Sequence, residues 1–115
     1  MTNIINFWSG QTVIIVKTKE DYEKLKTISE IFNFEYRKYF FKITYTRLLE
    51  LFKFNYPKED QRLGIIIEYT NSKGFTFGPL KLYENGIRNG YFTEILPISK
   101  IWKETIKIKE KVLQI

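Results

Sequence analysis

The lysines near the end of the chain have the spacing that most clearly suggests chemistry. Four of them recur every three or four residues and share one side of a helix: Lys100, Lys103, Lys107 and Lys111. Ammonium groups in such a row can contact the phosphates of a nucleic acid. The alternative is an ordinary solvated helix face, because lysine is normally an exposed residue.

Basic and aromatic residues are interleaved in the middle of the chain. The basic members are Arg37, Lys38 and Lys42, and their aromatic neighbours lie between residues 36 and 41. A half-buried edge strand explains this pattern as well as an anion-binding patch does. Lys73 adds an exposed cation at an expected turn. We predict that these residues and the four lysines above contact nucleic acid or a nucleoprotein.

The residue types that most enzymes need are missing or isolated. The chain has no His and no Cys, which excludes the commonest general base, thiol nucleophiles, disulfides and the standard zinc ligands. Its only Asp residues are Asp21 and Asp60, and no Lys stands two residues after an acidic residue, as in many restriction-type nucleases. A Gly-rich phosphate loop ending in Gly-Lys-Ser/Thr is also absent. We therefore expect a protein that is not an enzyme and that holds no metal and no cofactor.

The stretch Leu63–Gly78 predicts a β-hairpin. Its first strand alternates, with Leu63, Ile65, Ile67 and Tyr69 on one face. Residues 71–74 (NSKG) suit a three-residue loop with Gly74 in the left-handed region, which would pair Asn71 with Phe75 and Tyr69 with Phe77. That loop puts both Phe side chains on the apolar face. A two-residue loop would put them on the Glu68 side, and we favour the first because it explains the glycine.

Part of this hairpin resembles the RNP1 segment of the RRM family of RNA-binding proteins. Residues 73–80 (KGFTFGPL) match it at Lys73, Gly74, Phe75 and Phe77, which is a resemblance over eight residues of the 115. The other positions differ: Thr76 replaces a Gly or Ala, Gly78 an aliphatic residue and Leu80 an aromatic one. The first strand, residues 13–16, lacks the partner aromatic. RRM aromatics stack on bases from an open sheet face, whereas we expect Phe75 and Phe77 in the core, so the family is not assigned.

The remaining patterns predict the elements around the hairpin. In order they are strands at Ile4–Trp8 and Gln11–Lys17, a helix opened by Thr18 and ended near Asn33, a strand at Phe34–Lys42, a helix at Ile43–Phe54, the hairpin, two strands within Leu80–Leu96 around the pairs Asn85-Gly86 and Asn89-Gly90, and a helix capped by Ser99. We therefore predict one α+β domain over residues 1–115. It has a β-α-β-α order followed by an antiparallel β-meander and a C-terminal amphipathic helix. Helices should cover one sheet face and leave the other partly open.

The composition indicates where the protein acts and which partners it favours. The first ten residues lack the features of a signal peptide, and no apolar run is long enough to span a membrane, so we expect a soluble cytoplasmic protein. The net charge of +6 favours anionic partners.

The heavy use of Ile, Lys, Asn, Tyr and Phe indicates an AT-rich genome. An alternative function is therefore a protein-binding inhibitor or adaptor, such as a phage or mobile-element protein that blocks a host enzyme or defence nuclease. The oligomeric state stays open.

Overall fold

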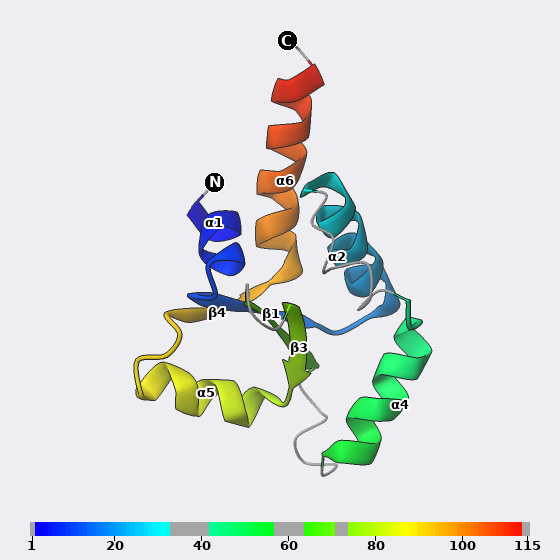
Figure 1. Cartoon of the computed structure of the whole chain (residues 1–115), viewed down its shortest axis with the longest axis vertical. Helices are drawn as coiled ribbons and strands as arrows, with labels where there is room; N and C mark the ends of the chain where they lie inside the picture. The colour runs from blue at the N-terminus through cyan, green and yellow to red at the C-terminus, as the bar shows by residue number, and fades with distance from the viewer. Residues whose placement is uncertain (1, 33–41, 57–63, 71–73, 114–115) are drawn as a thin grey trace.

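The computed structural model describes residues 2–32, 42–56, 64–70 and 74–113. Its elements follow one another as α1 (Thr2–Trp8), β1 (Thr12–Val16), α2 (Lys19–Phe32), α4 (Tyr45–Asn55), β2 (Ile65–Thr70), β3 (Gly74–Gly78), α5 (Leu80–Arg88), β4 (Glu94–Pro97) and α6 (Ile98–Leu113). The α+β class and the C-terminal helix are confirmed (Figure 1).

The sheet has the strand order β3-β2-β1-β4. β1 pairs with β2 and β2 with β3 in antiparallel fashion, whereas β4 lies parallel to β1, with Val13 opposite Ile95. The chain crosses from β3 to β4 through α5. The antiparallel meander therefore stops after the hairpin, and the prediction of two more meander strands is wrong.

The hairpin places its aromatic residues on the predicted face but in a different register. Tyr69 pairs with Phe75 and Ile67 with Phe77, so the predicted pairing is wrong by two residues. Because side chains alternate with a period of two, a shift of two residues leaves both Phe side chains on the same face. Gly74 has a φ of 72°, which confirms the predicted left-handed glycine.

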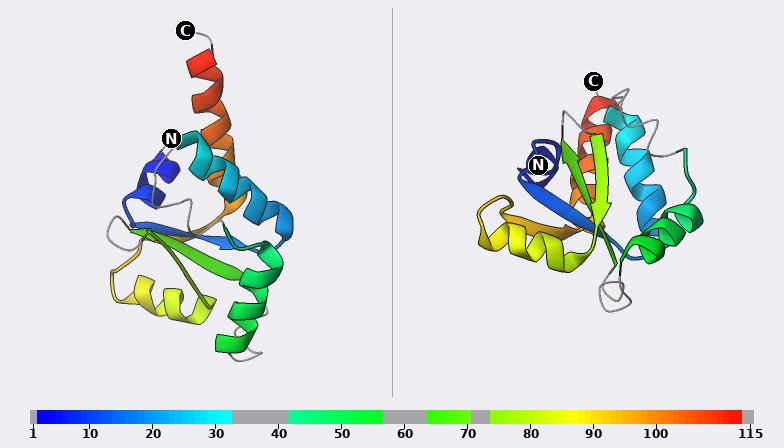
Figure 2. Two further views of the ribbon diagram at one scale, coloured as in Figure 1. Left: turned by 45° about the vertical axis from the view of Figure 1, so that its right-hand side comes forward. Right: turned by 60° about the horizontal axis from the view of Figure 1, so that its bottom comes forward.

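Helices α1, α2 and α6 lie against one face of the sheet, which we call the first face (Figures 1 and 2). A single apolar cluster joins them to it, and α4 contributes Leu48 and Phe52. The sheet supplies mainly β-branched and aromatic residues, among them Ile14, Val16 and Ile67. Each fully buried side chain of this size stabilises the fold by about 1.5–3 kcal/mol.

The opposite face, the second face, carries α5 alone among the described helices (Figure 2). Its buried members are Val13, Ile66 and Tyr83, and half-buried apolar side chains surround them. Glu68 and Thr76 also lie on this face, where the Thr76 hydroxyl lies 3.4 Å from Glu68 Oε1. The second face is thus covered only in part, as the sequence indicated.

Two segments predicted as strands are helical. Residues Ile4–Trp8 lie in α1, and Ser9-Gly10 ends that helix: the Ser9 N–H donates to Ile5 O at 2.9 Å, and Gly10 has a φ of 81°. In α5, Leu80, Tyr83 and Ile87 follow helical spacing after Pro79, a residue favoured at helix starts.

Helix α2 begins as the sequence predicts. The Asp21 N–H donates to Thr18 Oγ1 at 3.1 Å, and Asp21 Oδ2 accepts from the Lys17 N–H at 2.9 Å. The start of α6 differs, because the helix begins at Ile98 and Ser99 already lies inside its first turn. The predicted strand at Phe34–Lys42 lies outside the described residues except for Lys42.

Candidate nucleic-acid interface

Helix α6 is held to the first face by its first half. Ile98, Ile101 and Thr105 are buried, and the ammonium of Lys24 on α2 lies 5.9 Å from the centre of the Trp102 ring. α1 packs along the other side of the helix. The second half of α6 extends beyond both neighbours (Figure 1). The helix therefore presents its outer side, and much of its far end, to solvent.

All four predicted lysines of α6 are exposed. Lys100, Lys103, Lys107 and Lys111 follow one another at about 4.5–6 Å along the helix axis, so the row is about 16 Å long. They lie on the side of the helix opposite the buried Ile98, Ile101 and Thr105. We call this row the lysine face. Lys109, which the sequence pattern left off this row, is exposed on a different side of the helix.

Glu104, the acidic residue nearest to the lysine face, is turned into the protein. It is only 8% exposed. Its Oε1 accepts from the N–H of Asn3 at 3.0 Å and lies 3.5 Å from the N–H of Ile4, both in the first turn of α1. A carboxylate at a helix start is favoured by the free N–H groups and the helix dipole. Glu104 therefore holds α1 and does not stand among the exposed lysines.

The ionisation of Glu104 follows from the same contacts. Burial acts to raise the pKa of its carboxyl, but the N-terminal ammonium and the backbone N–H groups of Ile4 and Asn3 favour the charged form, and the pKa is lowered overall. The carboxylate therefore stays charged at neutral pH while facing α1. Between Ile98 and Lys109, the exposed charged side chains of α6 are all lysines, and the next exposed acidic side chain is Glu110.

Lys42 lies apart from the lysine face. Helix α2 packs on α6 along one side and on α4 along the other (Figures 1 and 2), and its exposed residues include Glu20, Glu23 and Glu30. Lys42 is beyond α2, at the entry to α4. The structure thus brings together the four lysines of α6 but does not join Lys42 to them. Arg37, Lys38 and Lys73 lie outside the described residues.

Lys42 instead belongs to a hollow that sequence reasoning missed. The hollow measures about 370 Å³ and is lined on one side by Lys19, Glu23 and Lys26 of α2 and on the other by residues 42–46. The hollow forms only where α2 packs against the start of α4, a contact between segments that are distant in the sequence. Lys19 and Lys26 are seven residues apart, which places both on one side of α2, and this spacing was the available signal.

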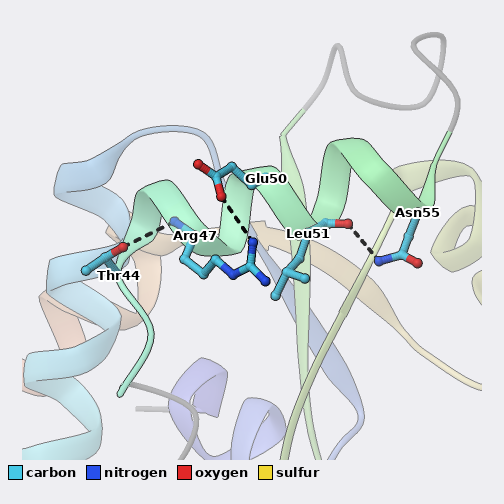
Figure 3. A network of polar contacts seen from close by, with 5 residues as sticks. All are labelled: Thr44, Arg47, Glu50, Leu51 and Asn55. Atoms are coloured by element: carbon cyan, nitrogen blue, oxygen red, sulfur yellow. Dashed lines mark hydrogen bonds and ion pairs between the residues drawn. The ribbon is translucent and has the colours of Figure 1, made fainter.

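The polar contacts of α4 fix the residues beside this hollow (Figure 3). Thr44 Oγ1 accepts from the Arg47 N–H at 3.2 Å and caps the helix, and the Arg47 guanidinium pairs with Glu50 at 3.2 Å. Asn55 Nδ2 donates to Leu51 O at 2.7 Å. Arg47 does not line the hollow, and the cationic side chains that do are Lys19, Lys26 and Lys42.

A groove on the second face is the other feature that the sequence did not predict. It measures about 470 Å³ and lies between α5 and residues Glu68, Tyr91 and Phe92. Leu82 and Tyr91 are 57% and 75% exposed at its rim. The prediction of two strands within Leu80–Leu96 gave no groove. The helical spacing of Leu80, Tyr83 and Ile87 was the signal that could have predicted it.

The aromatic pair that resembles RNP1 is not available for stacking on bases. Phe75 is 8% exposed, and its ring centre lies 5.2 Å from that of Tyr69 and 6.3 Å from that of Phe7. Phe77 is half-buried against the same cluster. Their prediction as core residues is confirmed.

Other kinds of site find no support in the described part of the chain. None of its helices combines the length and apolar character needed to cross a membrane. Its Asp and Glu residues form no group of three or more that could hold a metal ion. Comparison with protein-family models, with curated proteins and with solved structures finds no match to this chain.

Proposed function

We propose that this protein is a non-enzymatic binding protein that contacts nucleic acid, or a nucleoprotein, through the lysine face of α6. The observation that supports this most is the separation of charge on that helix. Lys100, Lys103, Lys107 and Lys111 are exposed, while Glu104 is withdrawn into the contact with α1. A solvated helix face needs no such separation.

The chemistry of the lysine face suits a phosphate backbone. Each ammonium that neutralises a phosphate releases condensed counterions, which makes binding favourable and strongly dependent on salt. Lysine acts as a compact point charge and does not read bases by a fixed geometry. The expected mode is therefore contact with the backbone and little sequence preference. Such a protein would act in the cytoplasm.

The experiment is a binding titration of duplex DNA and of RNA at several salt concentrations. The double variant Lys103→Gln with Lys107→Gln removes the centre of the row. It should weaken binding by about tenfold or more and lower the slope of log affinity against log salt by about 2. The matched control is Lys81→Gln with Arg88→Gln, which removes the same charge from exposed positions on α5. An equal loss in both double variants would contradict the proposal.

The alternative is a protein that binds another protein, as an inhibitor or adaptor of the phage or mobile-element kind. The groove rim supports it, because an exposed Tyr beside an exposed Leu is the sort of anchor that protein interfaces use. A pull-down from the native host, with and without nuclease, separates the two functions. A partner kept after nuclease at moderate salt, and lost in Tyr91→Ala, favours the alternative and counts against nucleic acid.

A further inference from the structure

The groove between α5 and the second face has an acidic lining on a basic protein. Among the described residues, Glu68 is the only charged one that lines it, although the chain has a net charge of +6. No described side chain is ion-paired with Glu68, whose carboxylate lies 3.4 Å from the Thr76 hydroxyl. The basic residues of α5, Lys81 and Arg88, are exposed but do not line the groove. The described lining is therefore negative.

Aromatic rings form the wall near this carboxylate. The ring centres of the buried Tyr83 and the half-buried Phe92 lie 5.4 Å apart, and both residues line the groove. Burial and, after it, the charge of Glu68 raise the pKa of the Tyr83 phenol to about 12, so the carboxylate lies close to that ring. A guanidinium suits such a place, because its flat and weakly hydrated group stacks on aromatic faces and donates two N–H groups to one carboxylate.

The remaining lining favours a protein segment over a free cation. Asn85 and Asn89 are four residues apart on the side of α5 that lines the groove. Their amides can both donate to and accept from a peptide backbone. The exposed Leu82 and Tyr91 offer apolar contact at the rim, which a small cation would leave uncovered. A phosphate backbone would instead be repelled by the carboxylate of Glu68.

We propose that this groove binds an arginine side chain of a partner protein, with the guanidinium at Glu68 and the flanking backbone of the partner along α5. The volume of about 470 Å³ lies within the range of about 300–1,000 Å³ that is usual for ligand sites. The inference rests on the protein-binding alternative and names the chemistry of its partner. It does not depend on the lysine face, because α6 packs on the first face and the groove lies on the second (Figure 2).

The test is an NMR titration of the whole chain with the blocked peptide acetyl-Leu-Arg-Leu-amide at low salt. The matched probe carries citrulline in place of arginine, which keeps the shape of the side chain and removes its charge. It should bind about tenfold more weakly, because a hydrogen bond between two charged groups is stronger than one with a neutral donor. The variant Glu68→Gln should bind the two probes equally, within about twofold.

The control variant is Glu84→Gln, which removes the same charge from an exposed position of α5 outside the groove. It should keep the preference for arginine, since exposed charges at a distance are screened. A preference that Glu68→Gln leaves unchanged, or that Glu84→Gln abolishes, would overturn the proposal. Circular dichroism checks that each variant is folded.

The comparison of the two probes on the wild type needs no variant. Equal binding of arginine and citrulline would overturn the proposal, as would shifts at Tyr91 with an RNA oligonucleotide and none with the arginine peptide. The protein-binding alternative can survive this failure. If Tyr91→Ala loses a host protein while the wild type does not distinguish the probes, the groove binds a protein but not through arginine.

Discussion

The two faces of the sheet differ in how firmly they are packed. On the first face, α1, α2, α4 and α6 bury an apolar cluster that runs from Phe7 to Ile101. On the second face, α5 buries Tyr83 with Val13 and Ile66, and the side chains around them are half-buried. The stabilisation that burial gives is roughly proportional to the apolar area that it removes from water. Most of the stability should therefore come from the first face.

This difference bears on where binding surfaces can lie. The first face is fully occupied, so its helices have only their outer sides free, and these carry the lysine face and the hollow. The second face keeps exposed apolar side chains, Leu82 and Tyr91, beside a groove. Exposed apolar groups in a groove mark contact surfaces more often than folding determinants. The surface proposed to bind phosphates by charge and the exposed apolar groove thus lie on opposite sides of one sheet.

Phe7→Ala should cause the largest loss of stability, since Phe7 is completely buried in the first-face cluster. Removing such a ring leaves a cavity and should lower the free energy of unfolding by about 3–5 kcal/mol in urea denaturation. Ile5→Ala is the control on the same helix. Ile5 is 64% exposed, and its loss should change the stability by about 0.5 kcal/mol or less. Equal effects would mean that α1 does not pack as described.

Alkaline pH should weaken both faces through their buried tyrosines. Burial is the main cause that raises the pKa of Tyr22, on the first face, and of Tyr83, on the second, each to about 12. The unfolded chain loses these protons near pH 10 and the folded chain later. The stabilisation is therefore complete below pH 10 and is lost as the pH rises through about 12, by about 2–3 kcal/mol for each tyrosine.

Urea denaturation at neutral pH and at about pH 11 measures this loss. Tyr22→Phe and Tyr83→Phe should each remove part of the alkaline decline. At neutral pH, Tyr22→Phe should also cost about 1 kcal/mol, because Ile43 O loses its donor. An alkaline decline that both variants leave unchanged would show that neither tyrosine titrates late.

Glu104→Gln should cost about 1–2 kcal/mol at neutral pH, since a charged acceptor at the start of α1 becomes neutral. Glu110→Gln, at an exposed position of the same helix, is the control. The lowered pKa of Glu104 means that its contribution is present above its ordinary pKa and is lost as the pH falls through its folded value. Acid unfolding should therefore be shallower in Glu104→Gln. Identical acid profiles would argue against the contact.

The sequence predicted features that depend on long or strictly alternating patterns. The face of Phe75 and Phe77 followed from alternation in Leu63–Gly78, and the exposed lysines followed from the long helical pattern of α6. Residues Ile4–Trp8 are too few to separate a period of two from 3.6. The burial of Glu104 depends on a contact with Asn3, which is 101 residues away in the sequence. No local sequence pattern reveals such a contact.

Gly86 gives the smallest predicted effect and the sharpest test of packing on the second face. The sequence pattern predicted two strands around it, but it lies in α5, where an added Cβ would stand 2.6 Å from the Phe92 ring. Alanine normally stabilises a helix by about 1 kcal/mol relative to glycine. Here the clash should reverse the sign, so that Gly86→Ala lowers the free energy of unfolding by about 1 kcal/mol.

Asn85→Ala is the matched control, because Asn85 is exposed and its neighbour carries the contact. It should raise the stability by a few tenths of a kcal/mol, about the difference in helix propensity. Phe92→Ala should make Gly86→Ala harmless, because the ring that obstructs the new methyl group is gone. If Gly86→Ala alone stabilises the protein in urea denaturation, Phe92 moves aside easily. The second face would then be looser than its buried Tyr83 suggests, and the contrast between the two faces would be larger.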